Sequence, residues 1–193
     1  MNKLKILILI LFCSNLFAQK KATSVQKEVE KPTEFTFSDN GLTDFVVIKC
    51  PDKKQPQLYK KTIDWVAVTY NVPSEVIKAK IENEYIRIEG YSKTMLNLTT
   101  ESGVFPVDAR YQIEISFKEG KYKFDVISVD YKLANWIEIN LTKSKSSFED
   151  SNDMIEKTNA TFPMEISSYF NDLNSKLKKF IESKQIPSKK SDW

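Results

Sequence analysis

The chain has 193 residues, of which 41% are hydrophobic and 28% are charged, so it can bury a core and wholesale disorder is not expected. It contains no histidine, which excludes catalytic triads, histidine general bases and histidine-ligated zinc or haem. The formal net charge is only +3, and Arg87 and Arg110 are the only arginines. Because nucleic-acid binding needs a concentrated excess of positive charge, we expect no nucleic-acid partner.

Residues 1–18 have the pattern of a cleaved signal peptide. Lys3 and Lys5 precede an apolar run, and Ala18 is a small residue where a signal peptidase would cut. The uncharged stretch is too short for a bilayer-spanning helix, which needs about 20 residues. The alternatives are a retained anchor and a lipoprotein modified at Cys13, although a bulky phenylalanine precedes this cysteine. We expect a periplasmic or secreted protein of the cell envelope, with no transmembrane span after signal cleavage.

The mature chain is nearly neutral, with 27 basic and 26 acidic side chains once the two leader lysines are removed. Its one remaining cysteine, Cys50, cannot form an intrachain disulfide and is interpreted as a small buried hydrophobe. Residues 19–40 are mostly polar and are assigned to a flexible linker, although order should begin near Phe35. A single domain then covers residues 41–185, and residues 186–193 form a tail.

The first expected strand covers residues 43–50, which are rich in β-branched side chains, and Pro51 ends it. A helix then begins at Pro56, where proline fits the first turn, and runs to Tyr70. The next segment, 74–81, could cap and start a helix, but its apolar residues also alternate with lysines. Because the same alternation resumes after an acidic turn, we favour a β-hairpin over a helix at this point.

The clearest pattern is a second β-hairpin, with a two-residue turn at Glu119–Gly120. This turn sets three pairs of apolar residues opposite each other, so that they share one buried face. The pairs are Phe117 with Tyr122, Ile115 with Phe124, and Ile113 with Val126. Beyond Val126 the alternation changes parity, which predicts a β-bulge.

Residues 134–161 are expected to be irregular, with one candidate edge strand over residues 136–141. The last element is an amphipathic helix over residues 163–184, whose apolar side chains recur at spacings of three and four. We expect this apolar face to cover a sheet. If it stayed exposed, it could instead pair in a coiled coil or attach the protein to a membrane surface.

Three segments carry a resemblance to a known family. They are Leu58-Tyr-Lys-Lys-Thr-Ile-Asp-Trp65-Val-Ala-Val-Thr-Tyr70, Tyr85-Ile-Arg-Ile-Glu-Gly90, and Tyr111–Tyr131 with its turn Lys118-Glu-Gly-Lys-Tyr122. They resemble the first helix and the later strands of a bacterial envelope family that is known as a domain of unknown function. The resemblance covers about residues 43–133 and the final helix.

This resemblance implies an α+β fold like that of the TATA-binding protein. The expected architecture is a single curved antiparallel sheet with two helices packed on one face, in the order β-α-β-β-β-β-α. The family motifs are packing motifs without a catalytic signature, so no active residues are transferred. The fold name does not imply DNA binding either, because function belongs to sites and not to folds.

Candidate chemistry is sparse. The second hairpin sets Glu114 opposite Asp125 on its polar face, and paired carboxylates can share a proton or hold a hard cation such as calcium. Lys123 lies diagonally beside Glu114 and would screen the pair, so we interpret these carboxylates as a solvated face and only as weak metal-site candidates. We assign no catalytic residues, and the isolated glycines form no phosphate-binding loop, so no cofactor is expected.

Trp136 and Trp193 lie outside the apolar stripes of the expected strands and helices, which makes them the candidates for partner contact. We expect a monomeric, non-enzymatic binding module of the bacterial envelope that offers its sheet to a protein, a peptide or a glycan. The alternative is a carboxylate-based hydrolase or a calcium-binding envelope protein, which would need several acids to converge in one pocket.

Overall fold

The structure is a computed structural model that describes residues 30–149 and 159–183. Lys31–Trp193 forms one compact unit, and the description below concerns this unit. The expected leader with its cleavage site, and the expected C-terminal tail with Trp193, lie outside the described residues.

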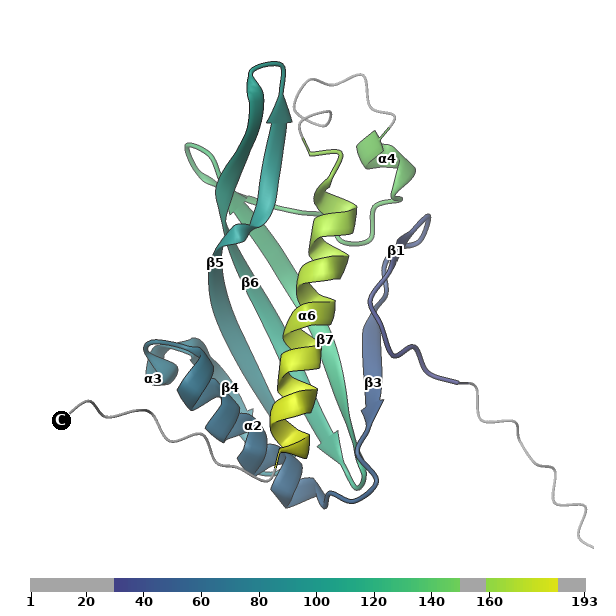
Figure 1. Cartoon of the computed structure of the whole chain (residues 1–193), viewed down its shortest axis with the longest axis vertical. Helices are drawn as coiled ribbons and strands as arrows, with labels where there is room; N and C mark the ends of the chain where they lie inside the picture. The colour runs from purple at the N-terminus through teal and green to yellow at the C-terminus, as the bar shows by residue number, and fades with distance from the viewer. Residues whose placement is uncertain (1–29, 150–158, 184–193) are drawn as a thin grey trace, which may run out of the picture. The chain divides into compact units, whose positions relative to one another are not determined.

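The centre of the unit is a six-stranded antiparallel sheet (Figure 1). Its strands are β3 (Phe45–Lys49), β4 (Ile77–Ile81), β5 (Tyr85–Thr100), β6 (Gly103–Lys118), β7 (Lys121–Lys132) and β8 (Trp136–Glu138). The spatial order is β3-β7-β6-β5-β4, and β8 pairs with the part of β7 that β3 leaves free. A small hairpin of β1 (Phe37–Ser38) and β2 (Gly41–Leu42) precedes the sheet.

The register of β6 and β7 confirms the expected hairpin around Glu119–Gly120. Phe117 lies opposite Tyr122, Ile115 opposite Phe124, and Ile113 opposite Val126. The register then shifts so that Gln112 lies opposite Ser128, which leaves Ile127 as the extra residue of a β-bulge. Burial explains this register, because a slip by one residue would turn every apolar side chain to the other face.

The ambiguous segment 74–81 contains both of the structures that its sequence allows. The single-turn helix α3 (Pro73–Val76) comes first, and β4 then pairs with β5 in the expected hairpin. Asn83 occupies the turn with φ of 63°, a left-handed conformation that asparagine tolerates better than most residues. The lysine alternation therefore predicts the strand correctly.

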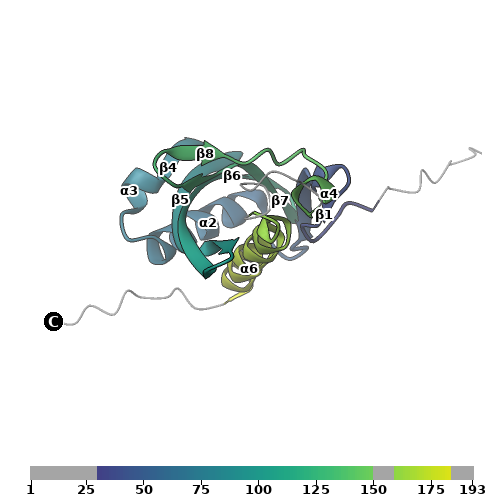
Figure 2. The same ribbon diagram turned by 90° about the horizontal axis from the view of Figure 1, so that it is seen from above.

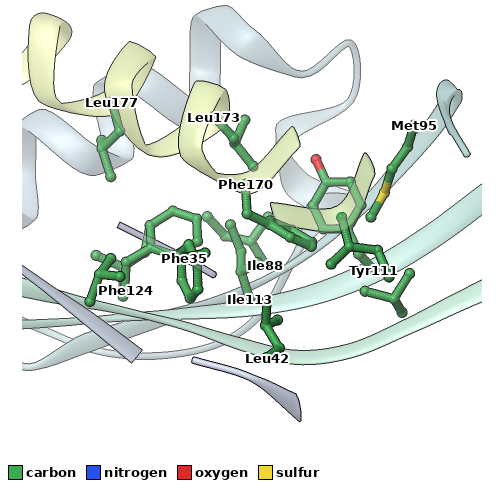
Figure 3. Close-up of a cluster of buried hydrophobic side chains, with 14 of the residues drawn as sticks. Phe35, Leu42, Ile88, Met95, Tyr111, Ile113, Phe124, Phe170, Leu173 and Leu177 are labelled. Atoms are coloured by element: carbon green, nitrogen blue, oxygen red, sulfur yellow. The ribbon is translucent and has the colours of Figure 1, made fainter. Parts of the chain in front are cut away.

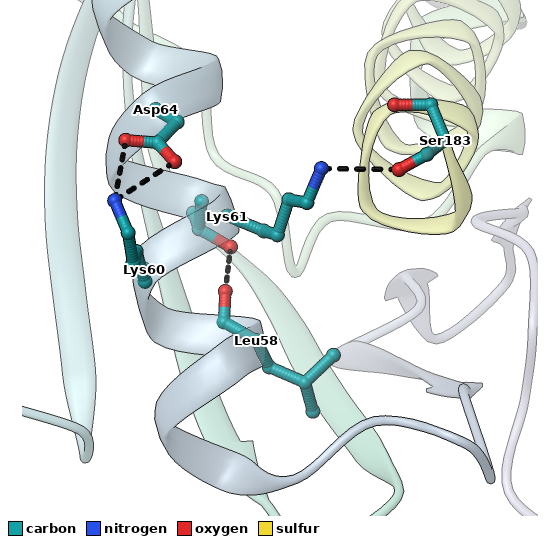
Figure 4. A network of polar contacts seen from close by, with 6 residues as sticks. Leu58, Lys60, Lys61, Asp64 and Ser183 are labelled. Carbon is teal, nitrogen blue, oxygen red and sulfur yellow. Dashed lines mark hydrogen bonds and ion pairs between the residues drawn. The ribbon is translucent and has the colours of Figure 1, made fainter. Parts of the chain in front are cut away.

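Helix α2 (Gln55–Thr69) confirms the helix expected from residue 56 to residue 70. The side chain of Gln57 accepts the backbone N–H of Lys54 at 2.9 Å and so caps its start. Inside the helix, the buried Thr62 hydroxyl donates to the carbonyl of Leu58 at 2.9 Å (Figure 4). Lys61 donates to the carbonyl of Ser183 at 3.0 Å, which joins α2 to the end of the last helix.

The last helix, α6 (Phe162–Glu182), confirms the expected C-terminal helix and packs its apolar stripe on the sheet. Both α2 and α6 lie inside the curve of the sheet, on one face (Figure 2). Six large apolar side chains of α6 are buried there: Phe162, Ile166, Phe170, Leu173, Leu177 and Ile181. This face is therefore not free for a coiled coil or a membrane surface. Within the described residues, no helix is both long enough and apolar enough to cross a membrane.

The core lies between the helices and the sheet (Figure 3). Phe170 is at its centre, with its ring edge-on to Tyr111 at 5.4 Å and to Phe35 at 6.2 Å between ring centroids. Phe35 is only 1% exposed, so the packed unit begins before residue 41, where the domain boundary was expected. The earlier start has a physical reason. Phe35 and Phe37 are large apolar side chains in a polar segment, and packing against the core removes them from water.

These observations confirm the expected fold class, an α+β arrangement with a mostly antiparallel sheet and two helices on one face. The segment expected to be irregular contains β8 and the single-turn helix α4 (Ser146–Glu149), and residues 150–158 lie outside the described part. Strands β5 and β6 are longer than expected. Beyond Ser92 they continue as a two-stranded arm (residues 96–107) that pairs with no other strand of the described residues.

Candidate functional site

The face of the sheet opposite the helices, called here the open face, carries polar side chains in registered rows. One row crosses the sheet through Arg87, Glu114, Asp125 and Phe45, and another through Tyr91, Arg110, Asp130 and Glu138. Directly opposite side chains on neighbouring strands lie close enough to interact. The open face is therefore an ordered array in which each side chain has defined neighbours.

Glu114 and Asp125 lie opposite each other on the open face, as the sequence predicts. Each has its own cation, because Arg87 contacts Glu114 at 2.8 Å and Lys123 contacts Asp125 at 2.6 Å. Lys123 thus pairs with Asp125 and not with Glu114, and Arg87, which sequence reasoning missed, is the partner of Glu114. Among the described residues no group of three or more metal-ligating side chains gathers here or elsewhere.

Burial raises the pKa of Asp125, and the neighbouring carboxylates of Glu114 and Asp44 add to this effect against the opposing influence of Lys123. The pKa of Glu89 is lowered instead, chiefly because the Lys78 ammonium group hydrogen-bonds to it. Both carboxylates are tied to partners within the sheet. Nothing in their geometry aims either of them at a bound substrate.

The nucleophilic side chains of the core are not activated. Cys50 is 4% exposed, and burial raises the pKa of its thiol, as expected for a small buried hydrophobe. The hydroxyls of Tyr70 and Tyr111 lie 3.1 Å apart, and Tyr169 donates to Tyr111 at 3.3 Å. Burial raises the pKa of both Tyr70 and Tyr111, so these phenols stay protonated and act as hydrogen-bonding groups of the core.

Trp136 belongs to a cluster at one end of the open face. The Arg110 guanidinium lies over its indole ring at 4.7 Å from the centroid, and Tyr91 meets it edge-on at 6.4 Å. We call Tyr91, Arg110 and Trp136 the Trp136 cluster. Arg110 is also held by Asp130 at 3.3 Å, so its guanidinium is fixed before any partner arrives.

The cluster combines one predicted partner residue with two that sequence reasoning missed. Trp136 was expected to be available for contact, and it lies half-buried on β8. Tyr91 is 51% exposed and lies directly opposite Arg110 on the neighbouring strand. Tyr91 and Arg110 could have been found from the pairing of β5 with β6. The sequence patterns do not predict this pairing over residues 91 and 110. Trp193, the other candidate, lies outside the described residues.

The family comparison covers the strands that build this site. Residues 45–132 match the family described as a domain of unknown function (DUF4468) with TBP-like fold. Strands β3 to β7 are thus similar to the DUF4468 family. This confirms the resemblance seen in the sequence. The matched segment runs from β3 to the end of β7, so it includes Arg110 and Tyr91 but neither Trp136 nor α6.

Two crystal structures are similar to this chain in fold. A DUF4468 family protein from Bacteroides ovatus is 11% identical, with a TM-score of 0.52 over 78% of this chain and 91% of that chain. A TBP-like protein from Parabacteroides distasonis is 10% identical, with a TM-score of 0.55 over 73% of this chain and 92% of that chain. At such identities the likeness concerns the fold alone. No curated protein matches the chain in sequence.

Proposed function

We propose that this chain is an exported, non-enzymatic binding module whose open face binds another protein of the bacterial cell envelope. The observation that carries the proposal is the Trp136 cluster, in which Arg110 stacks at 4.7 Å on the Trp136 ring with Tyr91 beside it. Tryptophan, tyrosine and arginine are the residues most enriched among the energetic hot spots of protein interfaces. Their convergence on a polar sheet face favours a protein partner.

The chemistry of the remaining side chains supports binding over catalysis. Glu114 and Asp125 on the open face are held by Arg87 and Lys123, and the buried thiol and phenols have raised pKa values. The export part of the proposal rests on the leader sequence at residues 1–18. It predicts that the protein recovered from cells begins at Gln19, which intact-mass measurement checks. An intact leader or a lipid on Cys13 would contradict it.

Site-specific photo-crosslinking in the cells that naturally produce the protein tests the binding face. A photoreactive residue in place of Tyr91 is expected to give a discrete crosslinked protein, because this position is exposed beside Trp136. The matched control replaces Val68, which is 40% exposed on α2 at the other side of the sheet. Adding Trp136→Ala should abolish the product from position 91. Identical products from both positions, or a product that Trp136→Ala leaves unchanged, would contradict the proposal.

A further inference from the structure

Three lysines lie side by side at the end of the open face that is remote from Trp136. Lys121 lies directly opposite Lys49 on one neighbouring strand and directly opposite Lys118 on the other. Their positions have the same parity as the outward-facing residues of β3, β6 and β7. We call Lys49, Lys118 and Lys121 the lysine row. Like charges placed directly opposite each other destabilise a sheet.

Elsewhere on the open face, four ion pairs set opposite charges side by side. They are Arg87 with Glu114, Lys123 with Asp125, Arg110 with Asp130, and Lys78 with Glu89. Across residues 30–149 and 159–183, no carboxylate pairs with any member of the lysine row. The lysine row therefore lacks the ion pairing that these four pairs provide elsewhere on the open face.

We propose that the lysine row contacts an acidic segment of the protein that the open face binds, an inference that rests on the function proposed above. Arg110 and Lys118 lie on the same strand, about 26 Å apart at roughly 3.3 Å per residue. A standard interface of about 800 Å² per partner is on the order of 30 Å across, so one partner can cover both ends of the face. The acidic segment then lies at the rim of that interface, where charge speeds association.

A protein fits this row better than a lipid surface does. Peripheral membrane attachment combines basic residues with apolar side chains that enter the bilayer. The next row contains Ser116 and Lys123 together with Val47 and Tyr85, which are both half-buried. Phe45 is half-buried too and lies between the ammonium groups of Lys31 and Lys123. Charge without insertion favours an acidic polypeptide.

Binding of poly-L-glutamate at low ionic strength tests the inference without the natural partner. The Lys118→Glu/Lys121→Glu variant should bind about tenfold more weakly than the parent, and added salt should remove this difference. The matched control is Lys60→Glu/Lys80→Glu, which changes the net charge equally. Lys60 lies on α2, and Lys80 lies opposite the helix-facing Ile86, so both are off the open face. The control should bind like the parent.

Thermal unfolding separates a binding defect from misfolding. The double substitution makes the contact of position 121 with Lys49 attractive but keeps a like-charged pair between positions 118 and 121. The Lys118→Glu/Lys121→Glu variant should therefore unfold near the temperature of the parent. If it unfolds earlier, Lys118→Gln/Lys121→Gln removes the charges without adding new ones and must still bind poly-L-glutamate more weakly than the parent.

Three outcomes would overturn the inference. They are equal losses in the row variant and the control, no loss in the row variant, and lysine-dependent binding to phosphatidylglycerol vesicles in place of poly-L-glutamate. The crosslink from position 91 reports separately on the proposed function. If that crosslink forms while poly-L-glutamate does not distinguish the variants, the lysine row alone is excluded from the interface. If the crosslink fails while binding follows the row, the proposed function fails and the acidic contact remains.

Discussion

Gly90 and Tyr111 face each other across β5 and β6, and the hydroxyl end of the tyrosine ring lies against the glycine. Tyr111 is 1% exposed and its ring also meets Phe170, so it cannot move away into solvent. A Cβ atom at Gly90 would overlap the end of the Tyr111 ring. The close approach, and not an unusual backbone angle, requires glycine at this position.

Gly90→Ala should therefore lower the free energy of unfolding by about 2–3 kcal/mol, a typical cost of overpacking a tight core. Urea unfolding followed by circular dichroism measures this loss. In a Tyr111→Ala background the same substitution should cost almost nothing, because the ring that it meets is gone. Equal costs in the two backgrounds would show that the contact with Tyr111 is not the cause.

Asp125 gives the open face a pH-dependent contribution to stability. Burial raises its pKa in the folded state, so the folded protein holds this proton more tightly than the unfolded chain does. Its stabilising effect is fully present below the unfolded pKa of about 3.9 and is lost as the pH rises through the folded pKa. Asp125→Asn should therefore become more stable relative to the parent between pH 4 and pH 7, as thermal unfolding across this range would show.

The double variant Glu114→Gln/Asp125→Asn tests the weak metal-site candidates. Asp125 is buried, but the side chains of the cations Arg87 and Lys123 are 42% and 40% exposed, and such solvent-exposed ion pairs contribute little. The free energy of unfolding of the double variant should therefore change by less than about 1 kcal/mol at pH 7. Unfolding is measured with and without calcium. A large loss of stability, with a calcium-dependent gain confined to the parent, would instead reveal a cation site.

At the scale of elements, α6 holds the base of the arm as well as covering the sheet. Asn97 lies on an edge of β5 that no strand covers, and its backbone N–H and side-chain amide donate to Glu165 at 2.9 and 2.7 Å. Thr161 donates to the Asn97 carbonyl at 3.3 Å. The first turn of the helix thus satisfies backbone groups of a free strand edge, which would otherwise be open to unwanted pairing.

Glu165→Ala should loosen this attachment without unfolding the sheet. The substitution removes two hydrogen bonds to a charged acceptor. The free energy needed to open the arm locally should therefore fall by about 2–4 kcal/mol. Amide hydrogen exchange should accelerate at Asn97 and its arm neighbours while Ile113 and Ile115 stay protected. Asp172→Ala is the control, since Asp172 is exposed on the same helix and pairs only with Lys176. Unchanged exchange at Asn97 would contradict the role of Glu165.

The elements differ in how far their sequences predict them, for physical reasons. The β6–β7 hairpin could be derived in full, because one buried face and a two-residue turn allow a single register. The arm could not, because beyond its buried base at Leu96 its two strands have no continuous buried face that would impose alternation. Missing the arm also hid the β5–β6 pairing. Counting opposite residues back from the turn of the arm would also give the wrong pairs for Arg87 and Tyr91, because the register shifts between Ser92 and Leu96.

The candidate site was predicted less well than the fold for the same reason. Trp136 could be singled out because it lies outside the apolar stripes, and Glu114 opposite Asp125 follows from a single hairpin. The partners Arg87 and Tyr91 come from β5, whose alignment with β6 depends on the irregular stretch after Ser92. A site whose residues come from several strands can be predicted only when the register of each pair of neighbouring strands is known.

At the scale of the whole molecule, Phe170 joins the parts of the core into one cooperative unit. It is fully buried and contacts Phe35 before the sheet, Tyr111 within the sheet and Tyr169 on its own helix. Phe170→Ala should cost about 3–5 kcal/mol, whereas Ser168→Ala on the exposed side of α6 should be nearly neutral. Tryptophan fluorescence and far-ultraviolet circular dichroism should report one coincident transition in both variants. Separate transitions would show that the helices and the sheet unfold independently.

The pairing of Phe35 with the last helix has a consequence for the order in which the molecule can assemble. The backbone N–H of Phe35 donates to the Asn171 side chain at 2.7 Å, and that side chain donates back to the Phe35 carbonyl at 2.9 Å, across a sequence separation of 136 residues. A chain that emerges N-terminus first, from a ribosome or a translocation pore, cannot form these two hydrogen bonds until Asn171 has emerged, when nearly its entire length is out. Folding is then completed late, in the compartment that receives the C-terminal helix, and the polypeptide stays open enough to be threaded until that moment.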